Sequence, residues 1–228
     1  MIAFESLDIG VDGRGFCRLC DGQYELDPHP ASLDDLKARI TSIAPRAMML
    51  VGFEPFSHPD LVAIIEACTE AGIDRIGMRT HAGALGNPNN ALGCISAGVR
   101  AFEVPIATGS THTADRVTGV AGQLEATWKG IAQIKAASRE LCIDTFIGVL
   151  IPLCPHTAPH LIEATGAAIR AGADAIRLAS VHDYTIERQT VATAHTMATR
   201  AGVALFGDGC EDCIEGAVLY RVNGVPSR

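Results

Sequence analysis

The chain has 228 residues, of which 48% are hydrophobic and 19% charged, a composition typical of a soluble globular domain with one sizeable core. Its formal net charge of −8 at pH 7 argues against a nucleic-acid partner, because phosphate binding requires a basic face. The chain has no apolar run of about 18 residues and no basic N-terminal stretch followed by an apolar one. We therefore expect no membrane span, no signal peptide and a cytoplasmic location.

Short apolar segments alternate with longer amphipathic ones along the chain, the pattern of a repeated strand–helix unit. The apolar runs predict strands at residues 3–9, 47–52, 75–80, 100–106, 144–152, 174–180 and 203–207. Apolar residues at helical spacing predict helices at residues 32–44, 58–72, 88–98, 123–141, 158–172 and 187–202. The polar stretch 109–119 is expected to be a loop, either for a substrate or cofactor or as a solvated connection.

Four predicted helices end in Ala-Gly, at Gly72, Gly98, Gly172 and Gly202, and a strand follows two or three residues later. Glycine suits the left-handed position that ends a helix. The repeat predicts an α/β fold: a single-domain (βα) partial or closed barrel of about six to seven parallel strands. The domain would span residues 1–228 and carry a short C-terminal cysteine knuckle and hairpin extension. A doubly wound sheet is the structural alternative.

Polar side chains follow nearly every predicted strand, and few precede one. Loops that lead from strands into helices emerge at the carboxyl ends of the strands, where barrels of this kind gather their active sites. The candidate residues at those ends are Cys17, Cys20, Glu54, Arg79, Thr80, His81, Cys154, His156, Ser180, His182, Asp183, Asp208, Cys210 and Cys213. This asymmetry predicts a functional site at the carboxyl edge of the sheet.

Eight cysteines in a chain expected to be cytoplasmic favour metal binding, catalysis or free core thiols over disulfides. Three of them are predicted to be small buried hydrophobes: Cys68, Cys94 and Cys142. Two Cys-x-x-Cys knuckles lie at opposite ends of the chain, at Cys17 and Cys20 and at Cys210 and Cys213. Together the knuckles are the donor set of a four-thiolate zinc or iron site, so we expect them to lie close together at one rim of the barrel.

Several motifs make the chain resemble the radical S-adenosylmethionine (SAM) superfamily. "GRGFCRLC" matches that family's Cys-x-x-x-Cys-x-x-Cys register with Gly13 in the place of the first cysteine. "VGFEP" resembles its Gly-Gly-Glu-Pro motif with Phe53 in the place of the second glycine, and "RTHAG" resembles its Thr-Asn-Gly. Residues 102–136 resemble the fourth strand, its loop and the next helix, and residues 171–183 resemble the sixth strand.

The resemblance implies an enzyme with a 4Fe-4S cluster and SAM at the barrel rim, acting on a small-molecule or peptide substrate. Its reductive chemistry would cleave SAM to a radical that takes a hydrogen atom from that substrate. The implied cofactor-binding residues are Gly52, Phe53, Glu54, Pro55, Thr80 and His81, with Glu54 accepting from the SAM amino group. The implied metal ligands are Cys17 and Cys20, completed by at least one of Cys210, Cys213 or Cys154, since Gly13 has no side chain.

Two other functions remain open at this stage. The first is a catalytically degenerate barrel whose four knuckle cysteines bind structural zinc or iron and which acts as a binding or partner protein. The second is a mononuclear metal enzyme built on His81, His156 and His182. A protein partner and a homo-oligomer are both compatible with the sequence.

Overall fold

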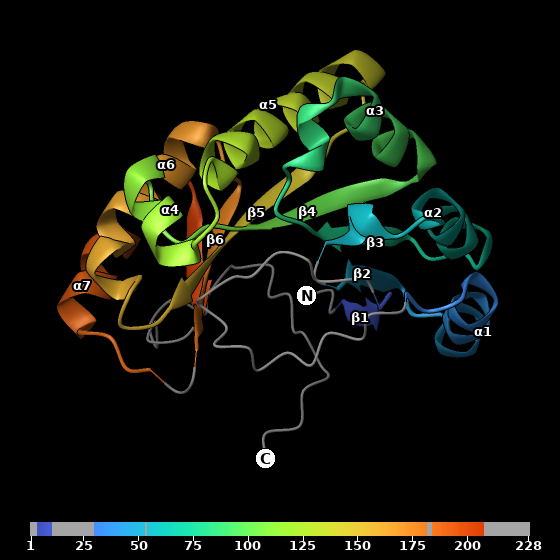
Figure 1. Ribbon diagram of the computed structural model, residues 1–228, viewed down its shortest axis with the longest axis horizontal. Coiled ribbons are helices and arrows are strands. Elements are labelled where there is room, and N and C mark those ends of the chain that lie inside the picture. Colours follow the sequence, from blue (N-terminus) through green and yellow to red (C-terminus); the bar gives the residue numbers. More distant parts are fainter. Residues whose placement is uncertain (1–3, 11–29, 53, 182–183, 208–228) are drawn as a thin grey trace.

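Seven parallel strands form one curved sheet in the computed structural model, which describes residues 4–10, 30–52, 54–181 and 184–207 (Figure 1). The strands are β1 (Glu5–Asp8), β2 (Ala47–Val51), β3 (Arg75–Arg79), β4 (Val99–Pro105), β5 (Phe146–Leu153), β6 (Ala175–Ser180) and β7 (Ala204–Gly207). Their order in the sheet is their order in the chain, with β1 and β7 at the two edges of the described sheet. The predicted knuckles, Gly13, Phe53, His182 and Asp183 lie outside the described residues.

Seven helices alternate with these strands and line the outer side of the curve (Figure 1). They are α1 (Leu33–Ile43), α2 (Leu61–Glu70), α3 (Pro88–Ala97), α4 (Thr111–Thr118), α5 (Gln123–Leu141), α6 (Leu161–Ala171) and α7 (Arg188–Arg200). The sequential strand order and the helices on one side confirm the predicted single-domain α/β partial barrel, and the doubly wound alternative is wrong. No helix in the described ranges has the length and hydropathy needed to cross a bilayer.

The two faces of the sheet carry different cores because successive side chains of a strand point to opposite faces. The outer face packs against the helices through large residues such as Leu50, Met78 and Phe102. The inner face has a smaller apolar cluster formed by Phe4, Ala47, Met49 and Ala101. Among the described residues, the inner surface of the sheet is therefore less completely covered by apolar side chains than the outer one.

The glycines that were predicted to end helices do so in the structure. Gly72, Gly172 and Gly202 have φ values of 76°, 78° and 73°, in the left-handed region that glycine adopts without a Cβ penalty. Gly98 also has a positive φ, of 130°, and its N–H caps α3 through the carbonyls of Cys94 and Ile95. These turns let each helix end close to the start of the next strand.

Two sequence predictions are wrong. Residues 109–119 contain α4: the Ser110 side chain accepts a hydrogen bond from the Thr113 N–H at the start, and Gly119 ends the helix with φ 77°. Cys142 is exposed, because it occupies the left-handed position at the end of α5, where the chain turns away from the helix. Cys68 and Cys94 are buried as predicted, and burial raises the pKa of these thiols to about 11 and about 12.

Candidate functional site

The Glu54 carboxylate joins the carboxyl ends of β2 and β3. Glu54 follows β2, and its Oε1 accepts hydrogen bonds from Thr80 Oγ1 at 2.6 Å and from the Phe56 N–H at 3.4 Å. Its Oε2 accepts from the His81 N–H at 2.9 Å and lies 3.4 Å from His81 Nδ1. With its side chain 18% exposed, Glu54 is a half-buried residue that links two loops, which we call the Glu54 clamp, rather than an exposed loop acid.

The loop after β3 is held against α5 by close backbone contacts. Thr127 Oγ1 on α5 donates to the His81 carbonyl at 2.8 Å. A Cβ added at Gly130, one turn further along α5, would lie 2.0 Å from the carbonyl oxygen of Ala82. Only glycine permits this close approach. The contact with α5 therefore holds the loop after β3 in the position where Thr80 and His81 donate to Glu54.

Room for a ligand exists next to His81. A pocket that is open to solvent lies at the carboxyl ends of β3, β4 and β5, with about 410 Å³ of empty space inside and in front of it; it is lined by His81, Pro105, Ala107, Pro152 and residues of α4 and α5. Gln123 lines it too, and Gln123 Oε1 is buried and accepts no hydrogen bond from the described residues. An unpaired buried oxygen is costly, so this atom offers a hydrogen-bonding position to a ligand or to water.

Further inside the barrel, Glu103 on β4 bridges two arginines. Arg79 Nε on β3 lies 2.5 Å from Glu103 Oε2, and Arg177 Nε on β6 lies 2.7 Å from Glu103 Oε1. Burial would by itself raise the pKa of the Glu103 carboxyl, but the two guanidiniums outweigh it and hold that pKa below its ordinary value. The Glu103 carbonyl also accepts the Thr80 N–H at 3.1 Å, which connects this ion cluster to the Glu54 clamp.

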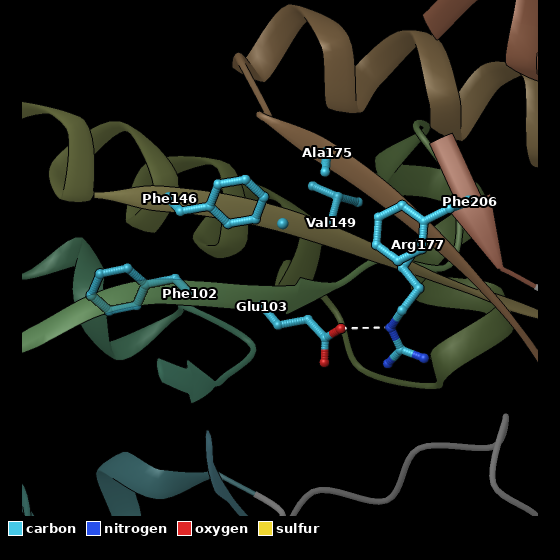
Figure 2. Close-up of a pocket in the computed structure, with 8 residues that line it drawn as sticks. Phe102, Glu103, Phe146, Val149, Ala175, Arg177 and Phe206 are labelled. Carbon is cyan, nitrogen blue, oxygen red and sulfur yellow. Dashed lines mark hydrogen bonds and ion pairs between the residues drawn. The ribbon is translucent and has the colours of Figure 1, made fainter. Parts of the chain in front are cut away.

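Figure 2 shows the pocket beside this cluster, with Glu103 and Arg177 pointing toward each other from neighbouring parts of the inner face. Its other walls include Phe146, Phe206 and Gly148, and the empty space of about 240 Å³ at this place includes the solvent in front of the pocket. Gly148 lies opposite Glu103 on one side and Ala175 on the other. Without a side chain there, Arg177 and Glu103 reach one another across β5.

Three further predicted site residues that the structure describes lie at the same edge but form no shared centre with Glu54: Cys154, His156 and Ser180. Cys154 is buried at the end of β5 in an apolar cluster with Ala107, and it accepts a 3.5 Å contact from Thr157 Oγ1. His156 is exposed, and Ser180 Oγ donates to the Tyr184 carbonyl. Within the described ranges no three His, Cys, Asp or Glu side chains are grouped closely enough to hold a metal ion.

The knuckle cysteines lie outside the described residues. The described residues nearest to them along the chain are Gly10, Pro30 and Gly207. The Ala31 N–H donates to the Ile9 carbonyl at 3.3 Å, so the segment between them leaves and returns at the carboxyl end of β1. His58 holds this return point, with Nε2 3.0 Å from the Ala31 carbonyl. The C-terminal knuckle follows β7, which ends at Gly207 on the opposite edge.

Sequence reasoning missed Glu103 and Arg177 as candidate residues. The signal was present: each is a charged residue within an apolar strand, in "RAFEVPI" and "DAIRLAS". A charge at such a position needs a partner, because burying an unpaired charge is very costly. That the two residues pair with each other required the strand order.

No protein-family profile matches the chain. Among curated proteins, the AdoMet-dependent heme synthase of Oleidesulfovibrio alaskensis is 25% identical over 178 residues, covering 70% of this chain and 45% of that protein. The AdoMet-dependent heme synthase of Methanosarcina barkeri is 31% identical over 108 residues, covering 47% of this chain and 30% of that protein. The chain thus spans less than half the length of these curated relatives.

Solved structures share the fold over nearly the whole chain. SuiB of Streptococcus suis bound to S-adenosylmethionine has a TM-score of 0.69 at 13% identity, covering 92% of this chain and 51% of that one. SuiB bound to its precursor peptide SuiA has a TM-score of 0.68, also at 13% identity, with coverages of 92% and 50%. Methylornithine synthase (PylB) has a TM-score of 0.65 at 11% identity, with coverages of 90% and 64%.

Proposed function

We propose, from the premise that this chain belongs to the radical SAM superfamily, that it binds SAM and a 4Fe-4S cluster at the carboxyl edge of its sheet. The observation that best supports this proposal is the Glu54 clamp, which joins the two strand ends carrying the "VGFEP" and "RTHAG" motifs. When bound, the cluster and SAM supply hydrogen-atom abstraction from a substrate. A small molecule or a peptide is proposed as that substrate, the latter because SuiB, which shares the fold, binds one.

The Glu54 carboxylate has an acceptor position that fits the ammonium group of a ligand. A carboxylate has about four lone-pair positions, and three of them accept hydrogen bonds: two short ones from Thr80 Oγ1 and the His81 N–H, and a weak one from the Phe56 N–H at 3.4 Å. The fourth, on Oε2, faces His81 Nδ1 at 3.4 Å, a distance too long for a strong hydrogen bond. We propose that the SAM amino group takes this position and that Gly52, Phe53, Pro55, Thr80 and His81 surround it.

The cluster is proposed to draw ligands from both edges of the sheet. Cys17 and Cys20 would supply two thiolates from the segment anchored at the end of β1, and Gly13 cannot supply a third. The third would come from Cys210 or Cys213 after β7, or from Cys154 at the end of β5. Three thiolates would leave one iron open, whereas four thiolates on one zinc would leave no position free for SAM.

Anaerobic purification and reconstitution, followed by iron, sulfide and zinc analysis with a visible spectrum, tests the cluster. We expect close to four iron and four sulfide per chain. Stoichiometric zinc without sulfide would overturn the proposal in favour of a degenerate barrel with a structural metal, acting as a binding or partner protein.

Calorimetric titration of SAM into the reconstituted protein tests the role of Glu54. Glu54→Gln keeps an acceptor for Thr80 but loses the charge, so we expect SAM affinity to fall by about 10- to 100-fold, corresponding to about 1.5–3 kcal/mol. Asp60→Asn, an exposed acid at the start of α2, is the matched control and should leave the affinity unchanged. Equal affinities in both variants would remove Glu54 from the site.

A further inference from the structure

We propose that Arg79, Arg177 and Glu103 form a binding site for a carboxylate of the substrate on the inner face of the barrel. The proposal names a substrate class for the function proposed above and rests on that function for its biological meaning. It concerns residues deeper in the barrel than the Glu54 clamp, on strands β3, β4 and β6.

The charges within the cluster do not balance. The cluster contains two guanidiniums and one carboxylate, so it carries one surplus positive charge inside the sheet. One arginine is enough to neutralise the Glu103 carboxylate. The second arginine adds the cost of removing another charge from water, and no further carboxylate in the cluster neutralises it. The surplus charge is satisfied if an anion from outside the protein joins the cluster.

Each arginine keeps its terminal Nη nitrogens available to a ligand. Both contact Glu103 through Nε, and their terminal Nη nitrogens make no hydrogen bond to any residue within the described ranges. In Figure 2 the terminal nitrogens of Arg177 lie at the end of the side chain away from β6. The side chains of Arg79 and Arg177 stay 27% and 19% exposed, while Glu103 is only 7% exposed, so the arginines are the accessible members.

The pocket beside the cluster has mostly apolar walls and one charged end. Phe146, Phe206, Ala175 and Gly148 give it apolar and aromatic walls, and Arg177 and Glu103 form its charged end. A planar guanidinium binds a carboxylate with two parallel hydrogen bonds, a geometry that a lysine does not offer. A carboxylate held by the arginines would therefore have its apolar or aromatic body lying against these walls at the mouth of the pocket, since the enclosed part is too small for a ring.

The test uses fluorine NMR titration of the purified protein with 4-fluorobenzoate and, separately, with its uncharged counterpart 4-fluorobenzamide, at pH 7 and low salt. We expect the carboxylate to bind at least tenfold more tightly than the amide. Arg177→Gln should weaken 4-fluorobenzoate binding at least tenfold. Arg46→Gln removes the same charge from an exposed pair with Asp74 and should change nothing.

Glu103→Gln separates a ligand site from a purely structural cluster. It raises the cluster's charge from one to two and leaves one Nε group without its acceptor, so it should strengthen 4-fluorobenzoate binding several-fold even though it destabilises the fold. Arg177→Lys keeps the charge without the planar fork and should lose most of the preference for the carboxylate; it also serves if Arg177→Gln does not fold. Weaker or unchanged binding in Glu103→Gln would overturn the proposal, as would equal binding of the two probes to the unmodified protein.

A titration in the presence of SAM distinguishes a substrate site from the SAM site. The titration is repeated on the reconstituted protein with saturating SAM. Independent binding of 4-fluorobenzoate supports a substrate site, whereas its displacement by SAM would assign the arginines to the SAM carboxylate and overturn the inference. Selective carboxylate binding in a protein that binds no SAM would leave this site standing and overturn the proposed function alone.

Discussion

Glu103 is a carboxylate whose protonation is coupled to folding. Its pKa in the folded chain is lowered from an ordinary value of 4.5, because Arg79 and Arg177 outweigh the effect of burial. Between the folded pKa and about 4.5 the unfolded chain binds more protons than the folded one, so stability rises with pH in that window. The stabilisation is complete above the unfolded pKa and is lost as the pH falls through the folded pKa.

Glu103→Gln should therefore lower the free energy of unfolding by about 3 kcal/mol at pH 7, since two partly buried guanidiniums lose their partner. The difference from the unmodified protein should shrink as the pH falls below about 4.5, because the unfolded chain then takes up a proton at Glu103 that the folded chain binds only at lower pH. Urea denaturation at a series of pH values between 7 and 3 measures both effects. Glu66→Gln, an exposed position on α2, is the control, and an equal loss of stability in both variants would contradict the role of the cluster.

At the scale of the elements, α5 determines the position of the loop that carries Thr80 and His81. The contact depends on Gly130, whose missing Cβ admits the Ala82 carbonyl, and on the Thr127 hydroxyl. Ala82 itself has φ 62°, an unusual conformation for a residue other than glycine, which its complete burial maintains. The Glu54 clamp is thus supported by a helix that is distant from it in sequence.

Gly130→Ala should destabilise the protein by about 1–3 kcal/mol, because the added methyl group forces the loop or the helix to move. Gly93→Ala in α3 is the matched control: its Cβ meets no atom within 4 Å, and alanine favours the helix, so we expect stabilisation of up to about 1 kcal/mol. Thermal and urea unfolding of both variants measure the difference. Opposite signs are expected, and stabilisation by both substitutions would show that the loop adapts freely.

How far the sequence predicts each element depends on the strength of its pattern. The helix predicted at 123–141 matches α5 residue for residue, because many turns of apolar periodicity specify it. The short helix α4 was missed because its threonines and charged residues leave little apolar periodicity, and its Ser110 and Gly119 caps resemble ordinary loop residues. The Glu103–Arg177 pair was missed for another reason: its partners meet across β5, and the register of three strands is not contained in any one of them.

At the scale of the whole molecule, the proposed metal site depends on segments that leave the two edge strands. The sequence predicted the partial barrel correctly, because the βα repeat follows simple periodic rules, and the functional site at its carboxyl edge stays a prediction. The closeness of the two knuckles stays a prediction, since all four cysteines lie outside the described residues. It depends on whether β1 and β7 bring their following segments together, which local sequence patterns do not specify.

Replacing Cys210 and Cys213 with serine should lower bound iron as severely as replacing Cys17 and Cys20, if the edges share one cluster. Adding Gly13→Cys to the Cys210→Ser, Cys213→Ser variant should then restore iron, because the first loop regains three thiolates. Iron and sulfide analysis with electron paramagnetic resonance of the reduced protein measures this. An intact cluster in the Cys210→Ser, Cys213→Ser variant would show that the C-terminal cysteines are not ligands.

The sequential strand order also has a consequence for how the protein is made. Each strand pairs only with the strands before and after it in the chain, so the sheet can grow from β1 as the polypeptide leaves the ribosome. The last strand to join is β7, and the segment that follows it emerges later still. A metal centre shared by the two edges would thus be completed only after β7 and the cysteines that follow it have been synthesised, and its loading would report that all seven described strands have been made.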